Sequence, residues 1–141
     1  SQLYALRTKL KKPSGAMVLP EVISKEPLGP VVRQGDDQWF NIVKWTLNAL
    51  INAEEMGVTA ANVDKMKGSK NPALKRLLGT SGDAGPKMGL SAEWAYRAIK
   101  QVGNYSESFE RNIGQDSPLK IARGLNALWS KGGILYAPPI R

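Results

Sequence analysis

The sequence predicts a mostly helical chain without enzymatic activity, and three observations support that prediction. Between Gly35 and Gly57 the apolar residues recur with the spacing of a helix that is buried along one side. Beyond Gly57 the chain is divided into short helical segments by Gly, Pro and capping residues. Histidine and cysteine are both absent, so the commonest general base and every thiolate nucleophile or metal ligand are missing.

The stretch from Gly35 to Met56 is predicted to be the central core helix. Either Asp36 or Asp37 can accept hydrogen bonds from its first turn, and Gly57 provides a left-handed end. Its apolar residues are Trp39, Phe40, Ile42, Val43, Trp45, Thr46, Leu47, Leu50, Ile51 and Ala53. Because burying one Trp removes roughly 150–250 Å² from water, we expect Trp39 and Trp45 to be packed in the core.

The first 34 residues are predicted to contain one helix and two short strands. Residues 1–10 place three leucines on one helical face. Only two residues precede the first leucine, which suggests that the given sequence begins partway through a helix. Met17–Ile23 has the composition of a strand, but Pro20 restricts it to an edge. Ser24–Pro30 is a connector rich in Pro and Gly, and Pro30–Arg33 is a second strand candidate.

Five short helices are predicted after the core helix. The pair Asn104 and Glu107 has the spacing of a capping box, and Ser117-Pro118 has the pattern of a cap followed by proline at the first helical position. Thr80–Pro86 is expected to be a loop and Ile134–Arg141 an extended tail. The five helices are Ala60–Met66, Ala73–Leu78, Ala92–Val102, Tyr105–Ile113 and Leu119–Ser130.

Length and charge restrict the class of protein. A chain of 141 residues suits one domain, and its formal charge of +8 permits acidic proteins, acidic membranes or nucleic acids as partners. A nucleic-acid surface would interleave basic and exposed aromatic residues, whereas the tryptophans here lie on apolar helix faces. Nucleic-acid binding therefore stays the alternative function. The basic clusters are Lys9, Lys11 and Lys12, and Lys65, Lys67, Lys70, Lys75 and Arg76.

No motif in the sequence predicts catalysis, a metal or a cofactor. The sequence has no glycine-rich phosphate loop and no acidic cluster with the spacing of metal ligands. The pairs Asp36-Asp37 and Glu54-Glu55 are adjacent, so each pair diverges around its helix. No apolar run is long enough for a transmembrane helix, and the N-terminus does not look like a secretory signal peptide.

Several long blocks of the sequence resemble one known family. That family is the periplasmic general L-amino-acid-binding proteins of bacterial ABC transporters, in the polar-amino-acid branch of the type II solute-binding proteins. The blocks are Leu19–Arg33, Gly35–Trp45, Val102–Tyr105, Phe109–Asn112, Ser117–Trp129 and Gly132–Arg141. The resemblance covers essentially the whole chain and corresponds to the C-terminal part of the family's longer sequence.

The resemblance implies an α/β fold with two lobes, of which this chain forms a mostly helical C-terminal fragment with two short hinge-crossing strands. Residues 1–23 would end the second lobe, and residues 31–141 would form the C-terminal part of the first lobe. The second hinge crossing would consist of Ser24, Lys25, Glu26, Pro27, Leu28, Gly29 and Pro30.

The resemblance also implies the partners. In the family, the residues that hold the ligand's carboxylate and ammonium groups come from sequence that would precede Ser1, so none can be assigned here. The implied function is non-enzymatic capture of L-amino acids in the periplasm and their delivery to the ABC transporter permease, without a cofactor. The fragment by itself would pair with the missing N-terminal portion or with another copy of the chain.

Overall fold

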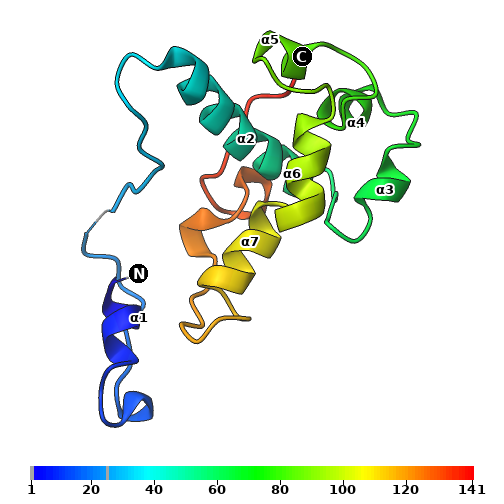
Figure 1. The fold of residues 1–141 in the computed structure, drawn as a ribbon. Helices are drawn as coiled ribbons and strands as arrows, with labels where there is room; N and C mark the ends of the chain where they lie inside the picture. The colour runs from blue at the N-terminus through cyan, green and yellow to red at the C-terminus, as the bar shows by residue number, and fades with distance from the viewer. Residues whose placement is uncertain (1, 25) are drawn as a thin grey trace.

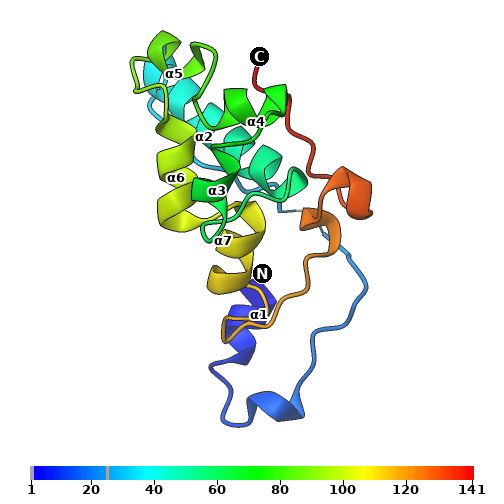
Figure 2. The ribbon, with the colours of Figure 1, turned by 90° about the vertical axis from the view of Figure 1, so that its right-hand side faces the viewer.

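A computed structural model describes residues 2–24 and 26–141 and divides them into an arm and a helical body (Figure 1). The N-terminal arm comprises the described residues between 2 and 36. It extends from the first turn of the long helix α2 back to the N-terminus, and its own short helix α1 lies away from the body (Figure 1). The body, residues 37–141, places the remaining helices around α2, as the perpendicular view also shows (Figure 2).

The arm contains α1 (Gln2–Arg7) and one 3-10 turn (Pro13–Gly15). The strands predicted at Met17–Ile23 and Pro30–Arg33 are wrong for this chain, because the described residues there have irregular backbone. A strand needs a neighbouring strand to complete its hydrogen-bond ladder, and the arm has no strand beside it in the described part of the chain. Its apolar side chains are correspondingly exposed, with Ile23 at 95% and Val31 at 95%.

The central helix α2 (Asp37–Glu55) forms as predicted. The carboxylate of Asp36 accepts a hydrogen bond from the backbone N–H of Trp39 at 3.0 Å, which caps the first turn. The helix ends before Gly57, whose φ of +68° is the left-handed conformation that glycine adopts without strain. The expected burial of Trp39 is wrong, since it is 51% exposed. Trp45 is half-buried against the core, as expected.

Five further helices surround α2: α3 (Val63–Met66), α4 (Pro72–Leu77), α5 (Ala84–Lys87), α6 (Trp94–Val102) and α7 (Tyr105–Asn112). Four of them correspond to predicted helices, and α5 lies across the end of the segment expected to be a loop. The main core fills the space between α2, α4 and α6. Its buried residues are Ala49, Ala53, Val58, Val63, Leu74, Leu77, Leu78, Trp94, Ala95, Ile99 and Ile140.

The helix predicted at Leu119–Ser130 does not form. That segment contains two 3-10 turns, Gly124–Asn126 and Trp129–Lys131. Lys120 and Gly124 have positive φ angles of 54° and 48°, which a right-handed helix cannot contain. Leu128 is instead paired with Leu135 in a parallel β-bridge, the one bridge found among the described residues. We call residues 119–137, which follow this path along α2 and α7, the C-terminal segment.

Candidate functional site

The predicted hinge lies in the arm, away from the helical body. The structure describes Ser24 and residues 26–30 as exposed, irregular backbone, and Leu28 is 84% exposed; Lys25 lies outside the described residues. Pro27 and Pro30 fix their own φ angles, and Gly29 between them does not. A segment with these properties can connect two bodies, but its role as a hinge stays a prediction.

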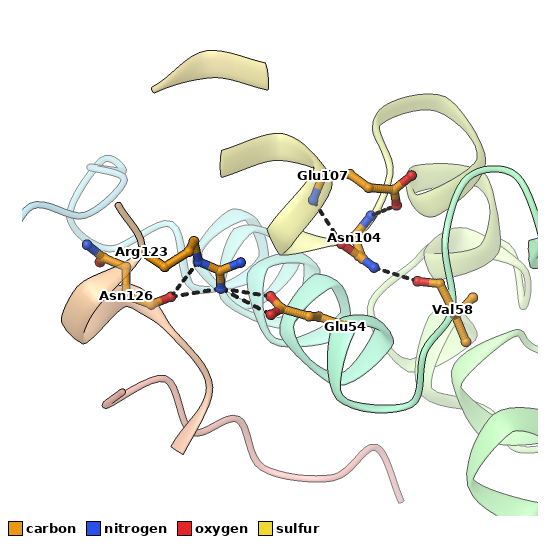
Figure 3. Close-up of polar contacts among 6 residues, drawn as sticks. All are labelled: Glu54, Val58, Asn104, Glu107, Arg123 and Asn126. Atoms are coloured by element: carbon orange, nitrogen blue, oxygen red, sulfur yellow. Dashed lines mark hydrogen bonds and ion pairs between the residues drawn. The ribbon is translucent and has the colours of Figure 1, made fainter. Parts of the chain in front are cut away.

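Arg123 is the centre of a polar cluster that the sequence did not single out. Its Nη2 donates to both carboxylate oxygens of Glu54, at 3.1 and 3.0 Å. Its Nε and Nη2 also donate to the backbone carbonyl of Asn126, at 3.1 and 2.8 Å (Figure 3). The Arg123 and Glu54 side chains are only 17% and 6% exposed. This buried ion pair joins the C-terminal segment to the last turns of α2.

The guanidinium group of Arg123 also lies against two rings of α7. Its Cζ atom is 5.4 Å from the ring centre of Tyr105 and 5.1 Å from that of Phe109, within the range of cation–π attraction. Burial raises the pKa of Tyr105, and the nearby positive charge of Arg123 acts in the opposite direction. Arg123 thus directs its charge and its hydrogen bonds at partners inside the fold, so the cluster is a structural joint.

Asn104 and Glu107 form the predicted capping box at the start of α7. The Asn104 side chain accepts from the Glu107 backbone N–H at 3.0 Å, and the Glu107 carboxylate accepts from the Asn104 backbone N–H at 2.8 Å (Figure 3). Asn104 Nδ2 donates to the carbonyl of Val58 at 2.8 Å. Glu107 further accepts from the N–H of Ala60 at 3.2 Å. The box therefore fastens the loop after α2 to α7.

A surface cluster of charges links α3 to α6. Asp64 accepts from Lys100 at 2.5 Å and from the Tyr96 hydroxyl at 2.8 Å, and these hydrogen bonds lower the pKa of Asp64. Lys67 donates to Glu93 at 2.6 Å, which lowers the pKa of Glu93 and raises that of Lys67. The two ion pairs, Lys100 with Asp64 and Lys67 with Glu93, lie at the surface, where such pairs contribute little to stability.

The body also contains one small open groove, of about 180 Å³. This volume is below the roughly 300–1,000 Å³ of common ligand pockets. Its apolar walls come mostly from α2, α5 and α6, with Lys87 and Arg141 on the lining. The groove is lined by Trp45, Ala84, Lys87, Met88, Trp94, Ile140 and Arg141.

No candidate chemical centre was found in the described part of the chain. Residues 2–24 and 26–141 contain no group of three or more acidic, histidine or cysteine side chains that could hold a metal. Among the same residues, no helix has the length and apolar character needed to cross a membrane. Every fully buried side-chain nitrogen and oxygen described there has a hydrogen-bond partner. The buried polar side-chain atoms of the described interior are therefore hydrogen-bonded within the chain.

The whole chain matches periplasmic binding proteins of amino-acid ABC transporters, at 51 to 67% identity, and it therefore belongs to that family. It is 67% identical to the general L-amino acid-binding periplasmic protein AapJ of Rhizobium johnstonii. It is 51% identical to the glutamate/glutamine/aspartate/asparagine-binding protein BztA of Rhodobacter capsulatus. All of this chain is covered in both matches, but it spans only 42% of the length of each relative. No family model matches the chain.

A solved structure confirms the fold. The ABC transporter periplasmic binding protein from Brucella ovis, solved with glutathione bound, superimposes with a TM-score of 0.93 at 57% identity. The match covers 99% of this chain and 44% of the Brucella chain. The family and fold class expected from the sequence are thus confirmed, and no relative in these comparisons favours the nucleic-acid alternative.

Proposed function

We propose that this chain supplies part of a non-enzymatic solute-binding protein that captures L-amino acids in the periplasm and delivers them to an ABC transporter permease. The observation that supports this most strongly is the match over the whole chain, at 67% identity, to a general L-amino acid-binding periplasmic protein. Since the chain spans 42% of that relative, the proposed activity belongs to a longer protein of which these residues are one part.

The proposed ligands share an α-amino and an α-carboxylate group. Free L-amino acids carry both, and glutathione, the molecule bound to the Brucella relative, carries both on its glutamyl end. A site for this pair of charges needs a cation and an anion held in place and desolvated. Arg123 and Glu54 are such a pair, but they bind each other. The ligand-contacting residues are therefore proposed to precede residue 1.

The proposed assignment of segments to the two lobes and the hinge follows their order in the chain. Residues 1–23 belong to the second lobe, 24–30 form the hinge crossing, and 31–141 belong to the first lobe. Ligand binding stabilises a closed arrangement of the two lobes, and the permease recognises that arrangement, because a ligand shifts an equilibrium toward the state it binds better. The exposed, irregular backbone at 26–30 is consistent with a connector that bends.

The test is calorimetric titration of a full-length protein in which residues 1–141 replace the matching part of AapJ. Glutamine, glutamate, arginine, leucine and glutathione are the titrants. Saturable binding of at least one of them is expected. If none binds while duplex DNA binds with an affinity that falls steeply with salt, the proposal is overturned in favour of the nucleic-acid alternative.

A further inference from the structure

The groove between α2, α5 and α6 continues into a narrow polar recess beside residues 140 and 141. Figures 1 and 2 place α5 and the last residues at the same end of the body. Ala84, Trp94, Ile140 and Arg141 line both the groove and the recess, so the two are contiguous. The groove has a volume of about 180 Å³ and the recess one of about 10 Å³. We call the two together the α5 site.

The groove suits one small apolar ring. Trp45, Met88 and Trp94 are its large apolar lining residues. Trp94 is 8% exposed and Trp45 is half-buried, and both are packed with the main core. A dry apolar cavity of roughly 150 Å³ accepts benzene. A groove of about 180 Å³ therefore has room for a six-membered ring with a short substituent.

Close packing fixes the wall that α5 contributes. A Cβ atom on Gly85 would lie 2.2 Å from the carbonyl oxygen of Ser91 and 2.6 Å from Cδ1 of Trp94, so only glycine lets α5 approach α6 this closely. Gln38 Nε2 donates a long hydrogen bond, of 3.4 Å, to the Met88 carbonyl and so joins the end of α5 to α2. The groove is therefore formed before any ligand binds, which lowers the cost of ordering it.

The lining of the α5 site carries an excess of positive charge. Arg76 and Arg141 line the recess, and Lys87 and Arg141 line the groove. Asp83 is the one acidic side chain among the described lining residues, and it is ion-paired with Lys87 at 3.0 Å. The charges of the two arginines are left over. A main-chain carboxylate on Arg141 would still leave one positive charge in excess.

Arg76 is placed to bind a carboxylate. Its Nε donates to the carbonyl of Ile140 at 3.0 Å, which holds the side chain at the recess. Its two Nη atoms make no hydrogen bond with any residue in 2–24 or 26–141. A guanidinium group binds the planar carboxylate with particular strength. The recess has about the volume of one water molecule, so it accepts a single carboxylate oxygen and is too small for a phosphate group.

We propose that the α5 site binds a small aromatic carboxylate, with its ring in the groove and its carboxylate group at Arg76 and Arg141. Free α-amino acids are disfavoured there, because their ammonium group would lie beside the same two arginines. The α5 site is thus separate from the amino-acid site proposed above, and the inference does not depend on the proposed function.

The test follows the indole N–H signals of the four tryptophans by NMR while the 141-residue chain is titrated with phenylacetate. Saturable shifts are expected for Trp45 and Trp94, with half-saturation at about 1 mM or below, and none for Trp39 or Trp129. Benzyl alcohol keeps the ring without the charge, and acetate keeps the charge without the ring. Each should bind at least about tenfold more weakly than phenylacetate. Equal affinity for phenylacetate and benzyl alcohol overturns the proposal, as do shifts that never saturate.

Two variants separate the recess from the groove. Arg141→Gln removes an exposed cation of the lining and is expected to weaken phenylacetate binding about tenfold, with less than a twofold effect on benzyl alcohol. Arg97→Gln, at an exposed arginine of α6 outside the lining, is the matched control and should change neither. Ala84→Leu fills the groove and should abolish binding of both. If Ala84→Leu does not fold, Arg141→Gln decides, and affinities equal to those of the control overturn the proposal.

The full-length chimera with AapJ completes the test. Phenylacetate should bind the chimera with unchanged affinity in the presence of saturating glutamine or glutathione. Loss of binding in the chimera would mean that the rest of the protein covers the groove, and it overturns the proposal. A chimera that binds phenylacetate but no amino acid contradicts the proposed function alone, and one that binds amino acids but not phenylacetate contradicts the α5 site alone.

Discussion

Arg123 connects three parts of the body that lie far apart in the sequence. Its side chain hydrogen-bonds to Glu54 of α2 and to the carbonyl of Asn126, and it lies against Tyr105 and Phe109 of α7. Because the Glu54 side chain is only 6% exposed, its carboxylate has lost most of its contact with water. The charge of Arg123 offsets most of that loss. Removing one partner of a buried ion pair costs more than the pair contributes.

Arg123→Ala is therefore expected to destabilise the body by about 3 kcal/mol. Arg123→Lys should cost less, since it keeps the charge but loses the forked geometry. Urea unfolding followed by circular dichroism measures both, and the exposed Arg97→Ala provides a control expected to stay within about 0.5 kcal/mol. A midpoint for Arg123→Ala equal to that of the control would show that the ion pair contributes nothing.

Two tryptophans of the body differ in burial and should differ in their contribution to stability. Trp94 is 8% exposed within the main core, whereas Trp39 is 51% exposed on α2. Trp94→Ala is expected to cost about 3–5 kcal/mol, and Trp39→Ala about 1 kcal/mol or less in the 141-residue chain. Thermal unfolding of both variants is the measurement. Equal losses would mean that Trp39 is buried in solution, contrary to the structure.

At the scale of elements, helices with a signal at both ends could be predicted from the sequence. Asp36 caps the start of helix α2, which ends before Gly57, and Asn104 with Glu107 caps the start of α7. The capping side chains pair backbone N–H groups that are left free at a helix start, so residues close in sequence are sufficient to set these helix ends. Such signals act through hydrogen bonds within the helix end itself, so they can be recognised in the local sequence. The start of α4 has the same kind of signal, because the Asn71 side chain accepts a hydrogen bond from the Ala73 N–H and Pro72 stands at the first helical position.

Elements that depend on contacts distant in sequence could not be predicted. Ser117-Pro118 looks like a helix start, but the Ser117 hydroxyl accepts the Leu119 N–H at 3.1 Å to close a turn, and the chain then pairs Leu128 with Leu135. That pairing competes with helix formation and is invisible to helical periodicity. The Arg123 cluster was equally hidden from the sequence, since the ion pair of Arg123 with Glu54 joins residues that are 69 positions apart.

The start of α7 offers a test of the capping box as a joint between elements. Asn104 is 4% exposed, and its side chain both accepts from Glu107 and donates to Val58. Asn104→Ala should cost about 2 kcal/mol, since it removes a cap and leaves the Val58 carbonyl unpaired. Asn104→Asp restores the acceptor but puts a carboxylate against that carbonyl, so it should not recover stability. In the control, the exposed cap change Asn71→Ala should cost about 1 kcal/mol.

Measurement by urea unfolding separates these cases. If Asn104→Asp were as stable as the unmodified chain, the hydrogen bond to Val58 would have no energetic role, and the box would act on α7 alone.

At the scale of the whole molecule, the exposed apolar side chains are concentrated in three places. They occur along the arm, at the first turns of α2 and on the C-terminal segment. The helices between these regions bury most of their large apolar residues against α2. The body thus has a core of its own, while its remaining surface has the composition of an interface, which is consistent with a chain that spans 42% of its relatives.

The last prediction concerns ligand binding by the 141-residue chain alone. Its described interior offers no unpaired buried charge, since Arg123 and Glu54 neutralise each other, and its 180 Å³ groove is apolar for the most part. Desolvating both charges of an amino acid without such partners is costly. We therefore expect calorimetry to detect no binding of glutamine, glutamate, arginine or leucine to the isolated chain, and binding to reappear in the full-length chimera. Micromolar binding by a chain shown intact by mass spectrometry would place the ligand site within residues 1–141 and refute its assignment to preceding sequence.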